Sequence, residues 1–281
     1  MYDSKPLPGG SHDLQDHESW HELIESYSSK SFSFTTDRLA AIAGITDWYQ
    51  VRTGRTPILG LWKESIVQDL SWGIYTGQAV LRFPIPGLPS WTWLFWDSNI
   101  LFEMHPFSEY HSSYDLQVLD CSVDWFGKPM TSNIKTSTLK VRGLLKTVKL
   151  SLYRVAERAS PGSLHSRRFI IETCPIEPDY FNGTSFDRFG GEEITPENAL
   201  KFLPDQSVEC LLLMYRYERS ELERYPSRHY LTFLLLERLS DGEEYPIYRR
   251  IGIGRLGTAF KNEDEPVPIF SGVEPTSLEL V

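Results

Sequence analysis

Apolar side chains recur at helical spacing along the first quarter of the chain. The first group lies at positions i, i+3, i+4 and i+7 and consists of Trp20, Leu23, Ile24 and Tyr27. That spacing places them on one face of a helix. A second helix is predicted after Thr36, whose side chain can cap its first turn. A third helix is predicted over 61–72, where Trp62, Ile66 and Leu70 repeat at helical intervals.

Beyond residue 88 the pattern changes to short apolar and aromatic runs separated by Pro, Gly, Asn and Asp, which is typical of antiparallel strands. Leu139 and Val141 alternate with polar neighbours, as expected of a strand with one buried face and one wet face. Further strands are predicted over 210–217, 230–239 and 248–253. This second part of the chain is therefore expected to be rich in β structure.

These patterns divide the chain into four parts. We predict a disordered lead-in over 1–16, a helical part over 17–87, a β-rich part over 88–260, and an acidic, proline-containing tail outside the core over 261–281. The predicted fold class is α+β, with about three N-terminal helices packed on a mainly antiparallel β-rich part. Whether that part closes as a barrel or packs as a sandwich is left open by the sequence.

The charge and cysteine content of the chain exclude several classes of function. Its 281 residues include 28 Lys and Arg against 38 Asp and Glu, a net charge of −10. This balance repels phosphate backbones and anionic lipids, so neither nucleic acid nor a membrane is an expected partner. Three cysteines, 53 and 36 residues apart, indicate reduced thiols rather than a disulfide framework. With no apolar leader segment, the sequence predicts a cytoplasmic protein.

One motif resembles a zinc site. His17, Glu18 and His21 fit the pattern H-E-x-x-H, in which two histidines one helical turn apart bind zinc and the glutamate activates a metal-bound water. A zinc hydrolase also needs a third ligand and a substrate cleft, and the sequence indicates neither. A zinc-dependent hydrolase using these three residues is therefore the alternative to our leading interpretation.

Two other motifs are interpreted as structural. Residues 252–257 fit G-x-G-x-x-G, but an acidic, proline-containing segment follows where a dinucleotide site needs a helix. Trp91, Trp93 and Trp96 could stack on a sugar or a base, although an aromatic strand buried against helices is commoner. The sequence contains no G-x-S-x-G, no phosphate-binding loop and no C-x-x-C pair. We predict no cofactor and no catalytic residue.

A basic stretch is the best candidate for a partner surface. Residues 135–168 hold nine Lys or Arg and one acid, Glu157, a local net charge of +8. The candidate surface residues are Lys140, Arg142, Lys146 and Lys149. An acidic protein segment or an anionic metabolite could dock there. Because several of these charges alternate with apolar residues, a solvated strand face is the favoured interpretation.

A series of short blocks in a fixed order carries a family resemblance. The blocks are Trp20 to Ser28, Phe34 to Gly44, Gly60-Leu61-Trp62, Leu70-Ser71-Trp72 and Pro89-Ser90-Trp91-Thr92-Trp93. This series resembles the region that follows the HET domain in fungal heterokaryon-incompatibility proteins. Residues 139–143 and 248–252 continue it more loosely, so the resemblance covers most of 20–257.

The resemblance implies a fungal cytosolic protein of a nonself-recognition family. In that family the HET domain is associated with programmed cell death when unlike fungal cells fuse, and the region after it is expected to be accessory or regulatory. Only nineteen residues precede the first block, too few for a HET domain, so no effector activity is carried over. We therefore expect a non-enzymatic module with a protein partner, either from a truncated HET protein or as a standalone paralogue.

Overall fold

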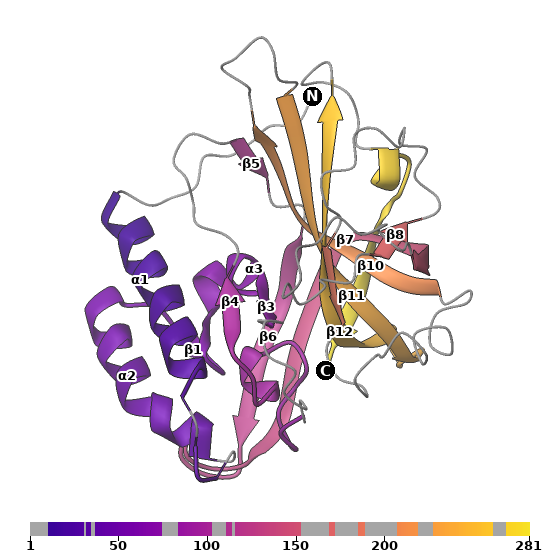
Figure 1. Ribbon diagram of the computed structural model, residues 1–281. Helices are drawn as coiled ribbons and strands as arrows, with labels where there is room; N and C mark the ends of the chain where they lie inside the picture. The colour runs from indigo at the N-terminus through magenta and orange to yellow at the C-terminus, as the bar shows by residue number, and fades with distance from the viewer. Residues whose placement is uncertain are drawn as a thin grey trace, which may run out of the picture.

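The computed structural model describes most of the chain, and its fold class is α+β as predicted. The described residues are 11–30, 32–34, 37–74, 84–102, 111–113, 116–152, 169–171, 185–188, 207–218, 227–260 and 268–281. Within them, three α-helices lie in the N-terminal part and long strands form most of the rest. The two long helices lie together at one side of the molecule, and most of the long strands lie at the other side (Figure 1).

The first two helices follow the predicted periodicity. In α1 (Ser11–Ser28), Trp20 and Ile24 are buried, as the spacing required. In α2 (Asp37–Thr53), the buried residues are Arg38, Ile42, Thr46 and Tyr49, again on one face. Thr36, the predicted cap, lies outside the described residues. Because α1 begins at Ser11, the prediction of a disordered lead-in over 1–16 was wrong for residues 11–16.

The predicted third helix over 61–72 was largely wrong. This segment instead contains strand β2 (Leu61–Trp62), a 3-10 turn η1 (Lys63–Ser65), a four-residue helix α3 (Ile66–Asp69) and the start of strand β3 (Trp72–Ile74). The physical reason lies in the two residues before it. Leu59 and Gly60 have φ angles of 49° and 79°, which turn the chain into a tight hairpin between β1 (Pro57–Ile58) and β2.

The short strand β3 pairs antiparallel with β4 (Ile100–Phe102). Between them lies a 3-10 helix, η2 (Trp93–Phe95), whose first turn is capped by the Thr92 hydroxyl, which accepts the Leu94 N–H at 3.2 Å. The Thr92 hydroxyl also donates to the Leu59 carbonyl at 2.6 Å. These contacts hold the PSWTW block against the β1–β2 hairpin.

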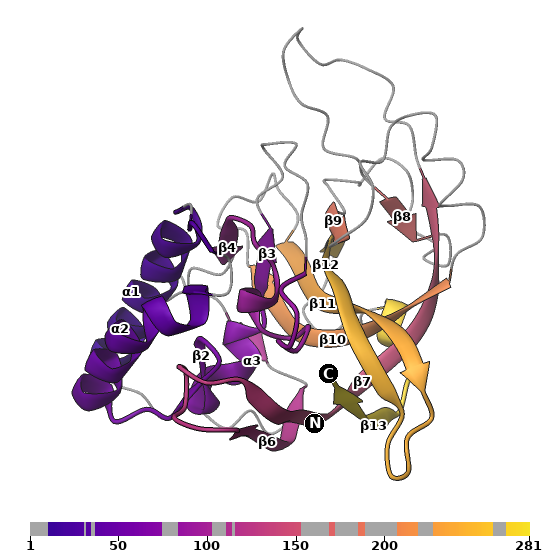
Figure 2. The same cartoon turned by 90° about the horizontal axis from the view of Figure 1, so that it is seen from below.

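The remaining strands form one large sheet. They are β5 (His111–Ser113), β6 (Gln117–Trp125), β7 (Ile134–Leu152), β8 (Phe169–Ile171), β9 (Ser185–Arg188), β10 (Ser207–Glu218), β11 (Ser227–Ser240), β12 (Ile247–Phe260) and β13 (Pro275–Leu280). The strand order is β5-β10-β11-β12-β13-β7-β6, and β10 also pairs with β7. That extra pairing closes a ring of five strands, so the β-rich part is a barrel rather than a sandwich (Figure 2).

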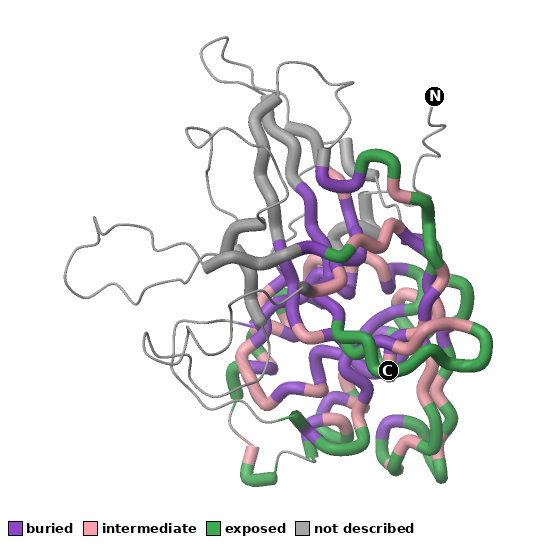
Figure 3. The backbone as a smooth tube through the Cα atoms, turned by 90° about the vertical axis from the view of Figure 1, so that its right-hand side faces the viewer, coloured by how far each residue is buried: buried purple, intermediate pink, exposed green. Residues whose placement is uncertain are grey.

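The prediction of a solvated tail over 261–281 was wrong for its described part. Residues 275–280 form β13, which runs parallel to β12 and antiparallel to β7. Leu278 and Leu280 are fully buried and alternate with half-buried neighbours; Figure 3 colours the described backbone by how far each residue is buried. The alternation of these two leucines with polar neighbours is the strand pattern, which the acidic and proline-rich composition before it obscured. Residues 261–267 lie outside the described residues.

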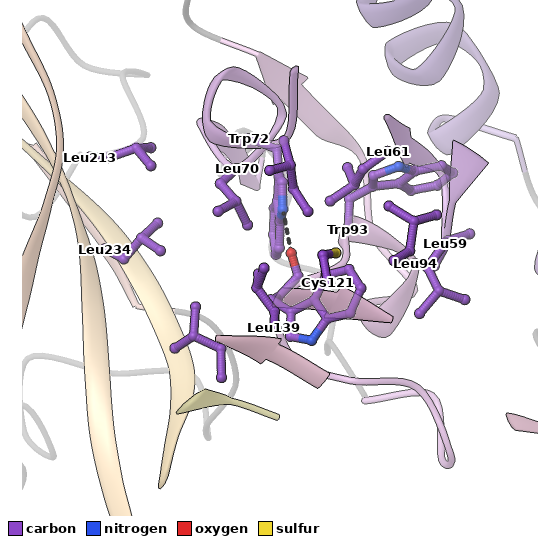
Figure 4. Close-up of a cluster of buried hydrophobic side chains, with 14 of the residues drawn as sticks. Leu59, Leu61, Leu70, Trp72, Trp93, Leu94, Cys121, Leu139, Leu213 and Leu234 are labelled. Carbon is purple, nitrogen blue, oxygen red and sulfur yellow. Dashed lines mark hydrogen bonds between the residues drawn. The ribbon is translucent and has the colours of Figure 1, made fainter. Parts of the chain in front are cut away.

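Strands β10 and β11 bury both of their faces. On β10, Leu211 and Leu213 join a large core with the helices, whereas Cys210 and Leu212 join a smaller one that includes Phe270 of η4 (Pro268–Phe270). Figure 4 shows Leu213 approaching Leu70 and Trp72 from the barrel side. The continuous apolar runs of β10 and β11 are therefore explained by burial on two sides.

Candidate functional site

His21 of the H-E-x-x-H motif lies in a buried hydrogen-bond network. Its Nε2 is 2.9 Å from Oδ1 of Asp69, and its ring stacks on Phe102 with 3.8 Å between the ring centroids. The other carboxylate oxygen of Asp69 accepts the backbone N–H of Trp62 at 2.7 Å and the Ser65 hydroxyl at 3.2 Å. Asp69 is completely buried. The network therefore ties α1 to the β2–α3 turn.

This arrangement leaves little of the motif for a metal. The ring nitrogen of His21 contacts a carboxylate, and one face of the ring is covered by Phe102. Glu18 lies on α1 and is half-buried, and the side chain of His17 lies outside the described part. Among the residues whose side chains are described, no three His, Cys, Asp or Glu groups come together as a metal site. The Nε2 atom of His21 is therefore engaged by Asp69, and the zinc-dependent hydrolase stays an untested alternative.

The candidate basic surface is partly engaged by the protein itself. The Nζ atom of Lys140 is 3.0 Å from a carboxylate oxygen of Glu244, and that pairing raises the pKa of Lys140 and lowers the pKa of Glu244. Lys146 donates to the carbonyl of Ile269 at 2.6 Å. Arg142 is exposed, and the side chain of Lys149 is not among those described. Two of the four cations therefore serve intramolecular contacts.

The glycine and tryptophan motifs are structural in the fold. Gly252 and Gly254 lie inside β12, which continues as a strand to Phe260, so no helix follows to bind a pyrophosphate. Trp91 and Trp93 are fully buried and Trp96 is 5% exposed, which places all three in the core. Trp72 donates its indole N–H to the carbonyl of Trp91 at 3.2 Å (Figure 4). None of these residues presents a ring face to solvent.

Two buried arginines were not anticipated from the sequence. Arg250 of β12 is fully buried; its Nη1 donates to the Leu70 carbonyl at 2.9 Å, and its Nη2 donates to the Trp72 carbonyl. Its guanidinium carbon lies 3.6 Å from the centroid of the Trp72 ring, which is cation–π distance. This residue joins the barrel to the helical part. Its partners are separated from it by about 180 residues, which no local pattern reveals.

Arg38 is the second buried arginine and belongs to the DRLAAIAGI block. It is 1% exposed and forms an ion pair with Asp97 at 3.0 Å. Its guanidinium lies 5.7 Å from the ring centroid of Trp93. Burial lowers the pKa of Arg38, and the neighbouring Asp97 opposes that shift. Tyr27 donates its hydroxyl to the Arg38 carbonyl at 2.6 Å, and burial raises the pKa of this phenol to about 12.

The carbonyl of Gly60 is the meeting point of three blocks of the predicted series. It accepts the indole N–H of Trp20 at 3.3 Å and that of Trp93 at 2.9 Å. A Cβ atom on Gly60 would lie 2.7 Å from the Trp93 indole nitrogen. Glycine is therefore required here both by its positive φ angle and by the lack of space.

The outer face of α2, formed by Ala41, Gly44, Trp48 and Val51, is open to solvent. Val51 is 88% exposed and Trp48 is 58% exposed. Phe34, which precedes the helix, is 69% exposed. The helix lies at the end of the molecule away from the barrel (Figure 1). Exposed apolar side chains of this size on one face are typical of interaction surfaces.

Comparison with protein-family models, with curated proteins and with solved structures found no match. The heterokaryon-incompatibility resemblance therefore depends on the sequence blocks alone. None of the helices in the described ranges is long and apolar enough to cross a membrane.

Proposed function

We propose that this chain is a non-enzymatic interaction module, the accessory or regulatory region of a fungal heterokaryon-incompatibility protein, which acts in the cytoplasm through a protein partner. The outer face of α2 is the main support for this proposal. Its Trp48 and Val51 side chains leave apolar surface in contact with water, and a bound partner would bury that surface. Aromatic side chains of this kind are frequent binding hot spots.

The blocks behind the family resemblance also support the proposal. Trp20, Gly60 and Trp93 come from three different blocks and share one hydrogen-bonded centre. Arg38, from a fourth block, lies 5.7 Å from the Trp93 ring. The sequence blocks therefore describe how one core is packed. A core of this kind is a structural scaffold, and its role does not depend on a catalytic group. The most specific blocks therefore determine the packed core against which the inner face of α2 lies.

Expression in a filamentous fungus tests the proposal. Wild-type chain is expected to change the frequency of cell death when unlike strains fuse, and a Trp48→Ser/Val51→Ser variant is expected to lose that effect. A Leu119→Ser/Phe126→Ser variant is the matched control, because it removes two exposed apolar side chains that lie outside α2, on β6 and directly after it. Unchanged death frequency with wild-type chain would refute a role in incompatibility. An active α2 variant would refute the assigned surface.

A further inference from the structure

We infer that the partner of the outer face of α2 is a second copy of this chain, paired antiparallel along the same helix. This inference rests on the proposed function, because it names the occupant of that interaction surface. The helix buries Arg38, Ile42, Thr46 and Tyr49 within its own subunit. Its opposite side carries Trp48 and Val51, exposed by 58% and 88%. The guanidinium of Arg52 lies 5.6 Å from the centroid of the Trp48 ring, and the rest of the exposed apolar surface faces solvent.

The charges of this face are arranged so that it complements itself. Asp37 lies in the first turn of α2 and Arg52 in its last turn, and both are exposed. If a two-fold axis passes between Gly44 and Ile45, Asp37 of each copy lies opposite Arg52 of the other. The two helix dipoles are then antiparallel, which is their favourable arrangement. A parallel pairing would instead place like charges together at both ends.

The sizes of the side chains match in the same register. Around that axis, the large Trp48 of one copy lies opposite the small Ala41 of the other, and the reverse holds at the symmetric position. Gly44 lies at the crossing point, where a Cβ atom would meet nothing within 4 Å of its own subunit. Helix backbones can approach most closely where small residues occupy the contact. Thus a single alignment of the two helices pairs opposite charges and also places each large side chain opposite a small one.

The monomeric chain has a mass of 32.4 kDa, so sedimentation velocity can follow dimer formation over a concentration series. One pair of helices buries a modest area, and we expect a dissociation constant on the order of 10 μM. Gly44→Leu is expected to weaken dimerisation at least tenfold by keeping the helices apart. Because the site is open, the same substitution should leave the thermal unfolding of the monomer unchanged or slightly improved.

A charge exchange tests the register. Asp37→Arg alone is expected to weaken the dimer, because it places two arginines opposite each other at both ends of the interface. Adding Arg52→Asp to the same chain should restore dimerisation, since every opposed pair again has opposite charges. A structural effect of Asp37→Arg within one subunit would not be rescued in this way. Circular dichroism of both variants checks that α2 is intact.

Each outcome decides between the two proposals. A wild-type dimer that is lost in Gly44→Leu and restored by the charge exchange supports the inference. A wild-type chain that stays monomeric at 200 μM, about twenty times the expected dissociation constant, overturns it, as does a dimer that Gly44→Leu leaves intact. If the chain is monomeric but the fungal death assay still depends on Trp48, the partner is a different protein, and the interaction function stands without self-association.

Discussion

Removal of the Asp69 carboxylate should strongly destabilise the protein. Asp69 is fully buried and accepts hydrogen bonds from the Trp62 N–H, at 2.7 Å, and the Ser65 hydroxyl, at 3.2 Å. A third contact joins it to His21 at 2.9 Å. Hydrogen bonds to a charged group contribute about 1.5–3 kcal/mol each, and the donors left behind in Asp69→Ala cannot reach water.

We expect Asp69→Ala to lower the free energy of unfolding by about 3–5 kcal/mol, the range for breaking a buried charged network. Total stability is about 5–15 kcal/mol for such proteins, so the variant should be close to marginal. Asp69→Asn is expected to cost less, because the amide keeps one acceptor oxygen in the same place. Asp120→Ala, on the exposed side of β6, is the matched control and should change stability by less than about 0.5 kcal/mol.

Urea unfolding followed by tryptophan fluorescence measures these differences, since several of the eight tryptophans belong to one buried core and the Trp62 N–H donates directly to Asp69. A double-mutant cycle with His21→Ala then isolates the His21–Asp69 contact, for which we expect a coupling energy of about 1–3 kcal/mol. An Asp69→Ala variant within about 1 kcal/mol of wild type would refute the reasoning, because the Trp62 N–H could then not depend on this carboxylate.

Four further predictions follow from single positions. Gly60→Ala should cost about 3 kcal/mol through clash with Trp93 and backbone strain, whereas Gly54→Ala, at similar φ but in open space, should cost about 1 kcal/mol in the same urea assay. Leu278→Ala should lower the free energy of unfolding by about 2–5 kcal/mol, because the side chain is fully buried, whereas Thr276→Ala should hardly change it. Equal effects of the two substitutions would support the original prediction of a solvated tail. Burial raises the pKa of the Cys121 thiol from 9.0 to about 12. In a Cys174→Ser background at pH 8, iodoacetamide should therefore label Cys121 of the native protein about a thousandfold more slowly than a free thiol. Rapid labelling of Cys121 without denaturant would contradict its burial. His17→Ala should leave metal content and unfolding midpoint unchanged, and a stoichiometric zinc ion lost in this variant would reinstate the hydrolase.

The hydrophobic periodicity correctly predicted those elements whose buried face follows one regular repeat along the sequence. The face of α1 around Trp20 and Ile24 follows the 3.6-residue period, and the strand around Leu139 and Val141 follows the period of two. Over 61–72 the same helical spacing was misleading, because Trp62, Ile66 and Leu70 are buried from different elements, namely strand β2, the start of α3 and the residue after α3. The signal that could have corrected it is Gly60 directly before the segment, a common residue at turns that need a positive φ angle.

The polar contacts of the core could not be predicted from the sequence for a different reason. Asp69, Arg38 and Arg250 look like ordinary surface residues in a linear reading, since charged side chains are rarely fully buried. Their partners lie 48, 59 and about 180 residues away, so only the folded arrangement brings each pair together. The closure of the barrel was hidden in the same way, because it depends on a pairing between β7 and β10.

The position of these buried charges bears on how the surface of α2 is held. Arg250 joins the barrel to the residues at the start of β3, and Arg38 joins α2 to Asp97 beside the tryptophan core, so a buried arginine lies on each side of that core. Buried charges are costly unless their geometry is maintained, which makes both arginine contacts sensitive to displacement. On the outer face of α2, the exposed Arg52 lies over the ring of Trp48, with 5.6 Å between the guanidinium carbon and the ring centroid. The fold therefore presents the apolar face of α2, which we infer to be self-complementary, on a helix whose inner face is buried in the core, and preorganisation of this kind favours specific association.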